Sequence, residues 1–183
     1  MKRSFLPLLL LLALPFAACD SGGGDEGDGP GSIPASPADN RIEWRAGGTS
    51  YAAEGDGTNP TAGSATGTYI ANGVGGQGQL SLFATAVQGT TPSTLIITAN
   101  QISGEGDYTL SLDNGSLFTF VQNEVSGTTV NVTSYIGESG SLSITEITDT
   151  GMRGSFTFEA TNQDDASDAI SITQGTFSVA FAQ

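Results

Sequence analysis

From Arg41 onward, apolar and polar residues alternate along the chain in short runs that turn-forming residues separate. Ile42 and Trp44 alternate with Glu43 and Arg45 in the first run. A period of two places successive side chains on opposite faces of an extended strand, and no segment keeps the helical period of about 3.6 residues. The pattern predicts strands around residues 42–45, 51, 67–71, 80–84, 95–99, 108–112, 118–120, 130–136, 142–146, 156–160, 170–172 and 177–181.

These runs are rich in Thr, Val, Ile and Phe, which suit a pleated and half-buried surface. Their spacing of about 8–12 residues is typical of an antiparallel β-sandwich or a flattened barrel of short strands. We expect one all-β domain over residues 41–183, with a turn at Asp113-Asn114-Gly115 and a C-terminal hairpin around Gln174-Gly175. We do not expect a parallel sheet, because helical crossovers are missing from the pattern.

The first 18 residues have the layout of a bacterial export signal. Met1-Lys2-Arg3 is basic, residues 5–16 are apolar, and Ala17-Ala18-Cys19 is a small-residue cleavage site. This layout resembles the lipobox of bacterial lipoproteins, with Phe16 where leucine is more usual. The resemblance implies that residues 1–18 are removed and that Cys19 carries a thioether-linked diacylglyceride. The apolar run is shorter than the roughly 20 residues that span a bilayer.

Residues 19–40 follow as a Gly/Pro/acidic stretch with Ile33 as its one sizeable apolar side chain. Such a stretch buries too little surface to offset its ordering entropy, so we expect a disordered tether. Its end-to-end distance would be about 25 Å, which would hold the domain away from the membrane.

Charge and composition narrow the chemistry of the domain. The chain has 19 carboxylates, no histidine and one cysteine, and Arg41, Arg45 and Arg153 are its only cations after residue 3. This acidity argues against nucleic acid as a partner. Without histidine, and with Cys19 acylated, the commonest general base, metal ligand and thiol nucleophile are missing, so we expect no cofactor and no enzyme.

Five short motifs resemble a family of lipoproteins of unknown function from Bacteroidota and their relatives. They are Ile42-Glu43-Trp44-Arg45-Ala46, Gly106-Asp107-Tyr108-Thr109-Leu110, Gly140-Ser141-Leu142-Ser143-Ile144-Thr145-Glu146-Ile147, Arg153-Gly154-Ser155-Phe156-Thr157-Phe158-Glu159-Ala160 and Ile172-Thr173-Gln174-Gly175-Thr176-Phe177-Ser178-Val179. The resemblance implies an all-β domain and supplies no catalytic residues. With Asp25-Glu26 behind the cysteine, it favours an outer-membrane lipoprotein facing the periplasm or the cell surface, whereas Asp20 would mean inner-membrane retention under the enterobacterial rule.

Several local patterns resemble functional motifs, but we expect them to have only structural roles. Gly73–Gly78 matches G-x-G-x-x-G, but a strand rather than a helix follows it, so we expect a loop. Asp149-Thr150-Gly151 spells the aspartic-protease triplet in a single copy, and we expect a hairpin turn with Gly151 at positive φ. Trp44 should point into the core, and Tyr51, Tyr69 and Tyr135 are weaker candidates for an exposed aromatic platform.

Carboxylates clustered in a loop are candidate ligands for calcium, which takes 6–8 oxygen ligands. The preferred candidate is Asp164, Asp165 and Asp168; Glu54 with Asp56 and Asn59, and Glu105 with Asp107, are others. The EF-hand spacing is absent, and a solvated acidic loop is the simpler interpretation.

The sequence therefore favours a non-enzymatic, lipid-anchored cell-envelope domain that binds or scaffolds a glycan or protein partner. Two alternatives stay open. One is a carboxylate-based hydrolase of the glycosidase kind, which needs two acids about 5–10 Å apart in a cleft. The other is a calcium-stabilised adhesin-like module.

Overall fold

The structure is a computed structural model that describes residues 40–55, 63–71 and 77–181. The described chain is almost entirely strand, so the all-β prediction is confirmed. Its elements are β1 (Arg41–Ala46), β2 (Thr49–Glu54), β3 (Ser64–Ile70), β4 (Gly78–Gln88), β5 (Thr91–Ile102), β6 (Gly106–Ser111), the 3₁₀ turn η2 (Leu112–Asn114), β7 (Leu117–Ser126), β8 (Thr129–Ile147), β9 (Gly151–Asn162) and β10 (Ala169–Ala180). The predicted signal segment, Cys19 and the tether lie outside the described residues.

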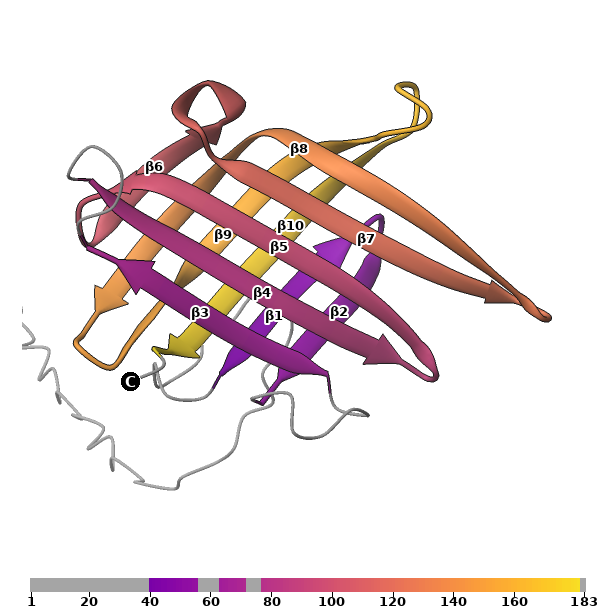
Figure 1. Cartoon of the computed structure of the whole chain (residues 1–183), viewed down its shortest axis with the longest axis horizontal. Helices are drawn as coiled ribbons and strands as arrows, with labels where there is room; N and C mark the ends of the chain where they lie inside the picture. Colours follow the sequence, from indigo (N-terminus) through magenta and orange to yellow (C-terminus); the bar gives the residue numbers. More distant parts are fainter. Residues whose placement is uncertain (1–39, 56–62, 72–76, 182–183) are drawn as a thin grey trace, which may run out of the picture.

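All strand pairings are antiparallel, in the order β2-β1-β10-β9-β8-β7-β5-β4-β3, with β6 paired to β8. Figure 1 shows β3, β4, β5 and β7 crossing in front of β1, β2, β9 and β10, so the sheet curls back on itself. Its two ends meet where the amide of Ala65 donates to the carbonyl of Gly55 over 2.9 Å. A bridge between Gly67 and Phe181 adds to this contact. The sheet is thus a flattened, nearly closed barrel.

The inward side of the barrel holds the core. Alternation along each strand sends one set of side chains inward, as in β4, where Leu80, Leu82 and Ala84 are buried and Phe83 is exposed. The largest fully buried side chains are Trp44, Phe118, Phe120, Phe156, Phe177, Ile42, Leu80, Leu82, Leu95, Ile97, Ile102 and Leu110. Burial of this apolar set is the main favourable contribution to folding.

The prediction of a C-terminal hairpin is wrong. Residues 169–180 form one strand, β10, and the register against β9 shifts between Ile172 and Gly175. Gln174 takes φ of 51° at this bulge. The turn-forming pair Gln174-Gly175 therefore adds an extra residue to a continuous strand instead of reversing it.

Residues 130–136 and 142–146 also belong to one strand, the 19-residue β8. Two irregularities in its pairing with β9, one between Gly137 and Ser139 and one between Ile144 and Glu146, each shift the register of the long strand. On its other edge β8 changes partner, because β7 pairs with it up to Gly137 and β6 pairs with it from Ser139. The change of partner within β8 therefore falls between Gly137 and Ser139.

One part of the sheet projects from the barrel. The pairing of β7 with β5 ends at Val121, and the pairing of β8 with β9 begins at Tyr135. Between these points β7 and β8 pair with each other as a two-stranded ribbon, here called the arm (residues 122–133). Figure 1 shows it extending beyond the other strands.

Candidate functional site

A polar pocket of about 410 Å³ lies where the arm leaves the barrel, and we call it the arm pocket. Strands β2, β4, β5 and β7 contribute to it. Its lining residues are Thr49, Tyr51, Gln88, Thr91, Ser93, Gln122, Asn123, Glu124 and Val125. All of these except Val125 carry a polar side-chain group, and none is a cation.

Hydrogen bonds from two lining side chains to backbone carbonyls fix the walls of the arm pocket. Nε2 of Gln88, at the end of β4, donates to the carbonyl of Ser50 on β2 over 2.7 Å. Nδ2 of Asn123 donates to the carbonyl of Pro92 and so ties the arm to β5. The pocket is therefore held by contacts between strands that are distant in sequence.

Aromatic rings support the pocket from the barrel interior. The ring of Tyr51 stacks on Trp44 with centroids 5.2 Å apart and meets Phe120 edge-on at 5.4 Å. The burial predicted for Trp44 is confirmed. The exposed platform suggested for Tyr51 and Tyr135 is wrong, because only 5% and 7% of these residues are exposed; Tyr69 is half-buried.

The electrostatics of the arm pocket favour a neutral tyrosine. Burial raises the pKa of Tyr51, and the Glu124 carboxylate raises it further, while a hydrogen bond with Ser93 opposes the shift. A buried phenol beside a carboxylate keeps its proton, since ionisation would place two negative charges together. Tyr51 can therefore donate or accept a hydrogen bond with a ligand over the neutral pH range.

Next to Phe120, Tyr135 connects the core to the β9–β10 loop. Its hydroxyl donates to Oδ2 of Asp168 over 3.1 Å, and Nδ2 of Asn162 donates to the same oxygen over 2.8 Å. Burial raises the pKa of Tyr135, and the Asp168 hydrogen bond and the charges of Asp168 and Glu124 add to the shift.

The three aspartates of the predicted calcium site are engaged in different ways. Asp168 accepts from Tyr135 and Asn162, whereas Oδ1 of Asp165 accepts from the amide and hydroxyl of Ser167 over 2.9 Å and 2.6 Å. These bonds from Ser167 lower the pKa of the exposed Asp165. The described residues contain no group of three or more His, Cys, Asp or Glu side chains placed to hold a metal ion. The structure thus does not bring Asp164, Asp165 and Asp168 together as ligands.

The two short sequence motifs have structural roles or lie outside the described ranges. Asp149 is exposed in the turn between β8 and β9, as predicted. Gly151 does not take positive φ, so that detail is wrong; the turn is stabilised instead by Oγ1 of Thr148, which accepts from the amides of Thr150 and Gly151. Of the G-x-G-x-x-G match, residues 73–76 lie outside the described residues, and Gly78 begins β4.

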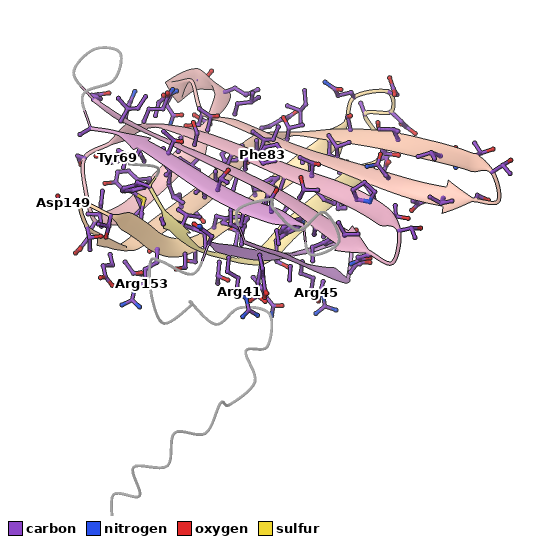
Figure 2. All side chains as sticks on the ribbon, turned by 60° about the horizontal axis from the view of Figure 1, so that its bottom comes forward. Arg41, Arg45, Tyr69, Phe83, Asp149 and Arg153 are labelled. Atoms are coloured by element: carbon purple, nitrogen blue, oxygen red, sulfur yellow. The ribbon has the colours of Figure 1, made fainter. Side chains whose placement is uncertain are left out.

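Charge is unevenly distributed over the barrel. No charged residue occurs between Asp56 and Glu105, so the whole of β3, β4 and β5 is uncharged. Figure 2 shows Arg41, Arg45 and Arg153 projecting on one side of the molecule. Arg41 pairs with Glu43 over 2.6 Å and Arg153 with Glu146 over 2.7 Å. The cations are therefore engaged on the outer face of β1 and β9, away from the lining of the arm pocket.

The acids of the described chain are likewise dispersed. Of the hollows lined by described residues, the arm pocket and three others on the surface each contain at most one carboxylate. In the arm pocket that carboxylate is Glu124, and in the hollow on β8–β10 it is Glu159, which accepts from the Ser171 hydroxyl over 2.6 Å. Within the described ranges, no helical segment has the length and hydropathy needed to cross a membrane.

Of the residues that line the arm pocket, the sequence singled out only Tyr51, as a candidate for an exposed aromatic platform. Gln88, Gln122 and Asn123 are uncharged; Gln88 ends β4, and Gln122 and Asn123 lie in the middle of β7, where the arm begins. One feature of the sequence could have pointed to this region. It is the long uncharged segment that ends before Glu105 in an otherwise acidic chain. Scans against family models, curated proteins and solved structures find no match to this chain.

Proposed function

We propose that the chain is a lipid-anchored cell-envelope protein whose barrel binds a neutral glycan in the arm pocket. The observation that carries this proposal is the lining itself, which presents amide, hydroxyl and carboxylate groups and no cation. Sugar hydroxyls both donate and accept hydrogen bonds, so they can pair with this mixture of donor and acceptor groups. The volume of about 410 Å³ lies in the range of small-molecule sites.

Charge argues for a neutral rather than an acidic sugar. Glu124 lies in the pocket, and the chain has a formal net charge of −14. A glycan rich in uronic acid or sulfate would meet a negative field without a cation to pair with. The uncharged strands β4 and β5, which form part of the pocket, add no preference for charge of either sign.

The pocket is also held in shape before a ligand arrives. The bonds from Gln88 to Ser50 and from Asn123 to Pro92 fix its rim, and the stack of Tyr51 on Trp44 fixes its base. A preorganised site loses less conformational entropy on binding.

The anchor is the second half of the proposal. Cys19 would carry the lipid, and residues 20–40 would let the barrel sample the space beside the membrane. Cys19→Ser should abolish incorporation of a labelled fatty acid and release the protein from the membrane fraction. Retention of both label and membrane association in the variant would contradict the anchor.

The glycan proposal is tested with the purified full chain on an array of neutral and acidic glycans. We expect binding to neutral glycans and about tenfold weaker binding after Gln122→Ala, because a hydrogen bond contributes about 0.5–1.5 kcal/mol. Gln77→Ala is the matched control, since Gln77 is exposed at the other end of β4. The proposal is wrong if no neutral glycan binds, or if Gln122→Ala binds as the unmodified chain does.

A further inference from the structure

The arm has an open strand edge. From Thr129 to Thr133, β8 pairs with β7 on one side, and no described strand pairs with it on the other, because β9 joins only at Tyr135. Val130 and Val132 point to the same face of the arm and are 59% and 60% exposed. A two-stranded ribbon on its own is marginally stable in water, and an open edge is a template for another strand.

The sequence of this edge is a palindrome, Thr129-Val130-Asn131-Val132-Thr133. We propose that the arm is a dimerisation element, in which this segment pairs antiparallel with the same segment of a second copy. The two-fold axis would pass beside Asn131, which would face its own counterpart. Thr129 would then face Thr133 of the second copy, and Val130 would face Val132 of the second copy.

The palindrome makes every cross-strand pair favourable. Val–Val pairs would form on one face and Thr–Thr and Asn–Asn pairs on the other, and such pairs stabilise antiparallel sheets. Val125 lies opposite Val130 in the arm and is 51% exposed. Joining two arms would therefore give a four-stranded sheet with a continuous row of valines on one face.

Charge favours this edge of the arm over the opposite edge of the arm. No charged residue occurs between Glu124 and Glu138. Glu124 lies opposite Asn131 on β7, so in the dimer the two Glu124 carboxylates would be separated by the two paired β8 segments. The opposite edge of the arm, in β7, has Glu124 near the middle of its free segment. Self-pairing of that edge about Glu124 would set two carboxylates against each other, which destabilises a sheet.

Disulfide trapping tests the register. In the full chain carrying Cys19→Ser, an introduced cysteine is the sole thiol. Directly opposed residues have Cα atoms about 4.5–5.5 Å apart, which is within disulfide range. We expect Asn131→Cys to form a covalent dimer on mild oxidation, and Thr129→Cys to do so at least tenfold more slowly. The double variant Thr129→Cys/Thr133→Cys should form the dimer again.

Gln77→Cys reports on random collision, because Gln77 is exposed far from the arm. Equal rates for Asn131→Cys and Gln77→Cys, or faster trapping of Thr129→Cys than of Asn131→Cys, would overturn the proposal. An absence of covalent dimer in every variant would overturn it too, and would leave a strand from another protein as the occupant of the edge.

A charge-swap experiment tests the pairing without a thiol. Asn131→Glu should weaken self-association of the full chain about fivefold in sedimentation velocity, because like charges would be opposed at the axis. Asn131→Lys should weaken it less, because Glu124 lies opposite residue 131 in each arm and partly neutralises the lysine. Mixing the two variants should restore association. Gln77→Glu, the control, should have no effect. If the mixture associates no better than either variant alone, Asn131 does not face its counterpart.

Discussion

Phe177 of β10 lies directly opposite Gly154 of β9, and its ring fills the space that a Cβ on Gly154 would occupy. The same relation joins Phe118 with Gly137 and Phe156 with Gly175; in the fourth pair, a Cβ on Gly140 would lie 2.7 Å from the Cβ of Phe158. All four rings are buried. The flattened barrel thus accommodates large rings in a narrow interior by placing a residue without a side chain across from each.

The substitution Gly154→Ala should destabilise the fold by about 3 kcal/mol. The added methyl group would meet the carbonyl oxygen of Ser143 and lie 2.9 Å from the Phe177 ring, so backbone and ring would both have to move. Urea denaturation at neutral pH measures the loss as a lower midpoint with an unchanged slope.

Gly127→Ala is the control for this substitution. Gly127 has φ of 64° in the turn of the arm, and nothing lies within 4 Å of a Cβ placed there. Alanine at positive φ costs about 1 kcal/mol without any clash. Equal losses from the two substitutions would mean that crowding by Phe177 is not the reason for Gly154.

The period of two in the sequence predicted where strands occur and which side chains face inward, as at Ile42 and Trp44, because alternation is a local property. It did not predict the length of β8 and β10. A glycine that follows Gln174 has the same local signature in a turn and in a bulge, and only the Phe156 ring on the neighbouring strand distinguishes the two. The Phe–Gly pairs could not be predicted either, because they too depend on which residues face each other across neighbouring strands.

The candidate site was less predictable than the fold. The Asp164, Asp165 and Asp168 cluster is conspicuous in the sequence, yet Asp168 turns to Tyr135 while Asp165 binds Ser167. The arm pocket depends on four strands meeting at one end of the barrel, so its residues share no local pattern. The arm edge is different, because its palindrome is visible in the sequence and only its exposure needed the structure.

The Arg41–Glu43 pair should contribute measurably to stability. Glu43 is only 5% exposed, and its Oε1 accepts from Nη2 of Arg41 over 2.6 Å. Arg41→Met would leave a buried carboxylate without this cation, and we expect a loss of about 2–3 kcal/mol in urea denaturation. The double variant Arg41→Met/Glu43→Gln should recover most of it.

Arg45→Met is the matched control for that pair. Arg45 is exposed and donates to the carbonyl of Gly48 over 3.2 Å, so the change should stay within about 0.5 kcal/mol. Additive losses from Arg41→Met and Glu43→Gln would show that the two side chains are not coupled.

Alkaline pH should destabilise the protein through Tyr51 and Tyr135. The pKa of each is raised above the ordinary value of 10.0 in the folded state. As pH rises past that value, the unfolded chain loses phenolic protons that the folded chain keeps. The stability that the two protonated phenols contribute is fully present below about pH 10, and it is lost as the pH rises through their pKa values in the folded state. Urea midpoints between about pH 8 and 11 should fall accordingly, and less so in Tyr51→Phe/Tyr135→Phe.

Tyrosinate absorbance separates this account from a general alkaline effect. Part of the tyrosinate absorbance should appear only above the ordinary pKa, because the pKa values of Tyr51 and Tyr135 are raised, and Tyr51→Phe/Tyr135→Phe should remove that part. A single titration near the ordinary value, unchanged in the double variant, would contradict the raised pKa values.

Tyr135→Phe removes the hydroxyl that connects β8 to the loop before β10. Asp168 would keep its bond from Asn162 at 2.8 Å but lose the one from Tyr135 at 3.1 Å, so we expect a loss of about 1–2 kcal/mol at neutral pH. Tyr69→Phe is the control, because the Tyr69 hydroxyl makes only a 3.4 Å contact with the carbonyl of Ile102. Hydrogen exchange should also speed up at the amide of Asn162, which donates to the Asp168 carbonyl, if the bond holds this loop against the barrel. If exchange at the Asn162 amide is unchanged, and if Tyr135→Phe and Tyr69→Phe lose equal stability, the loss comes from removing any tyrosine hydroxyl and not from the Tyr135–Asp168 hydrogen bond.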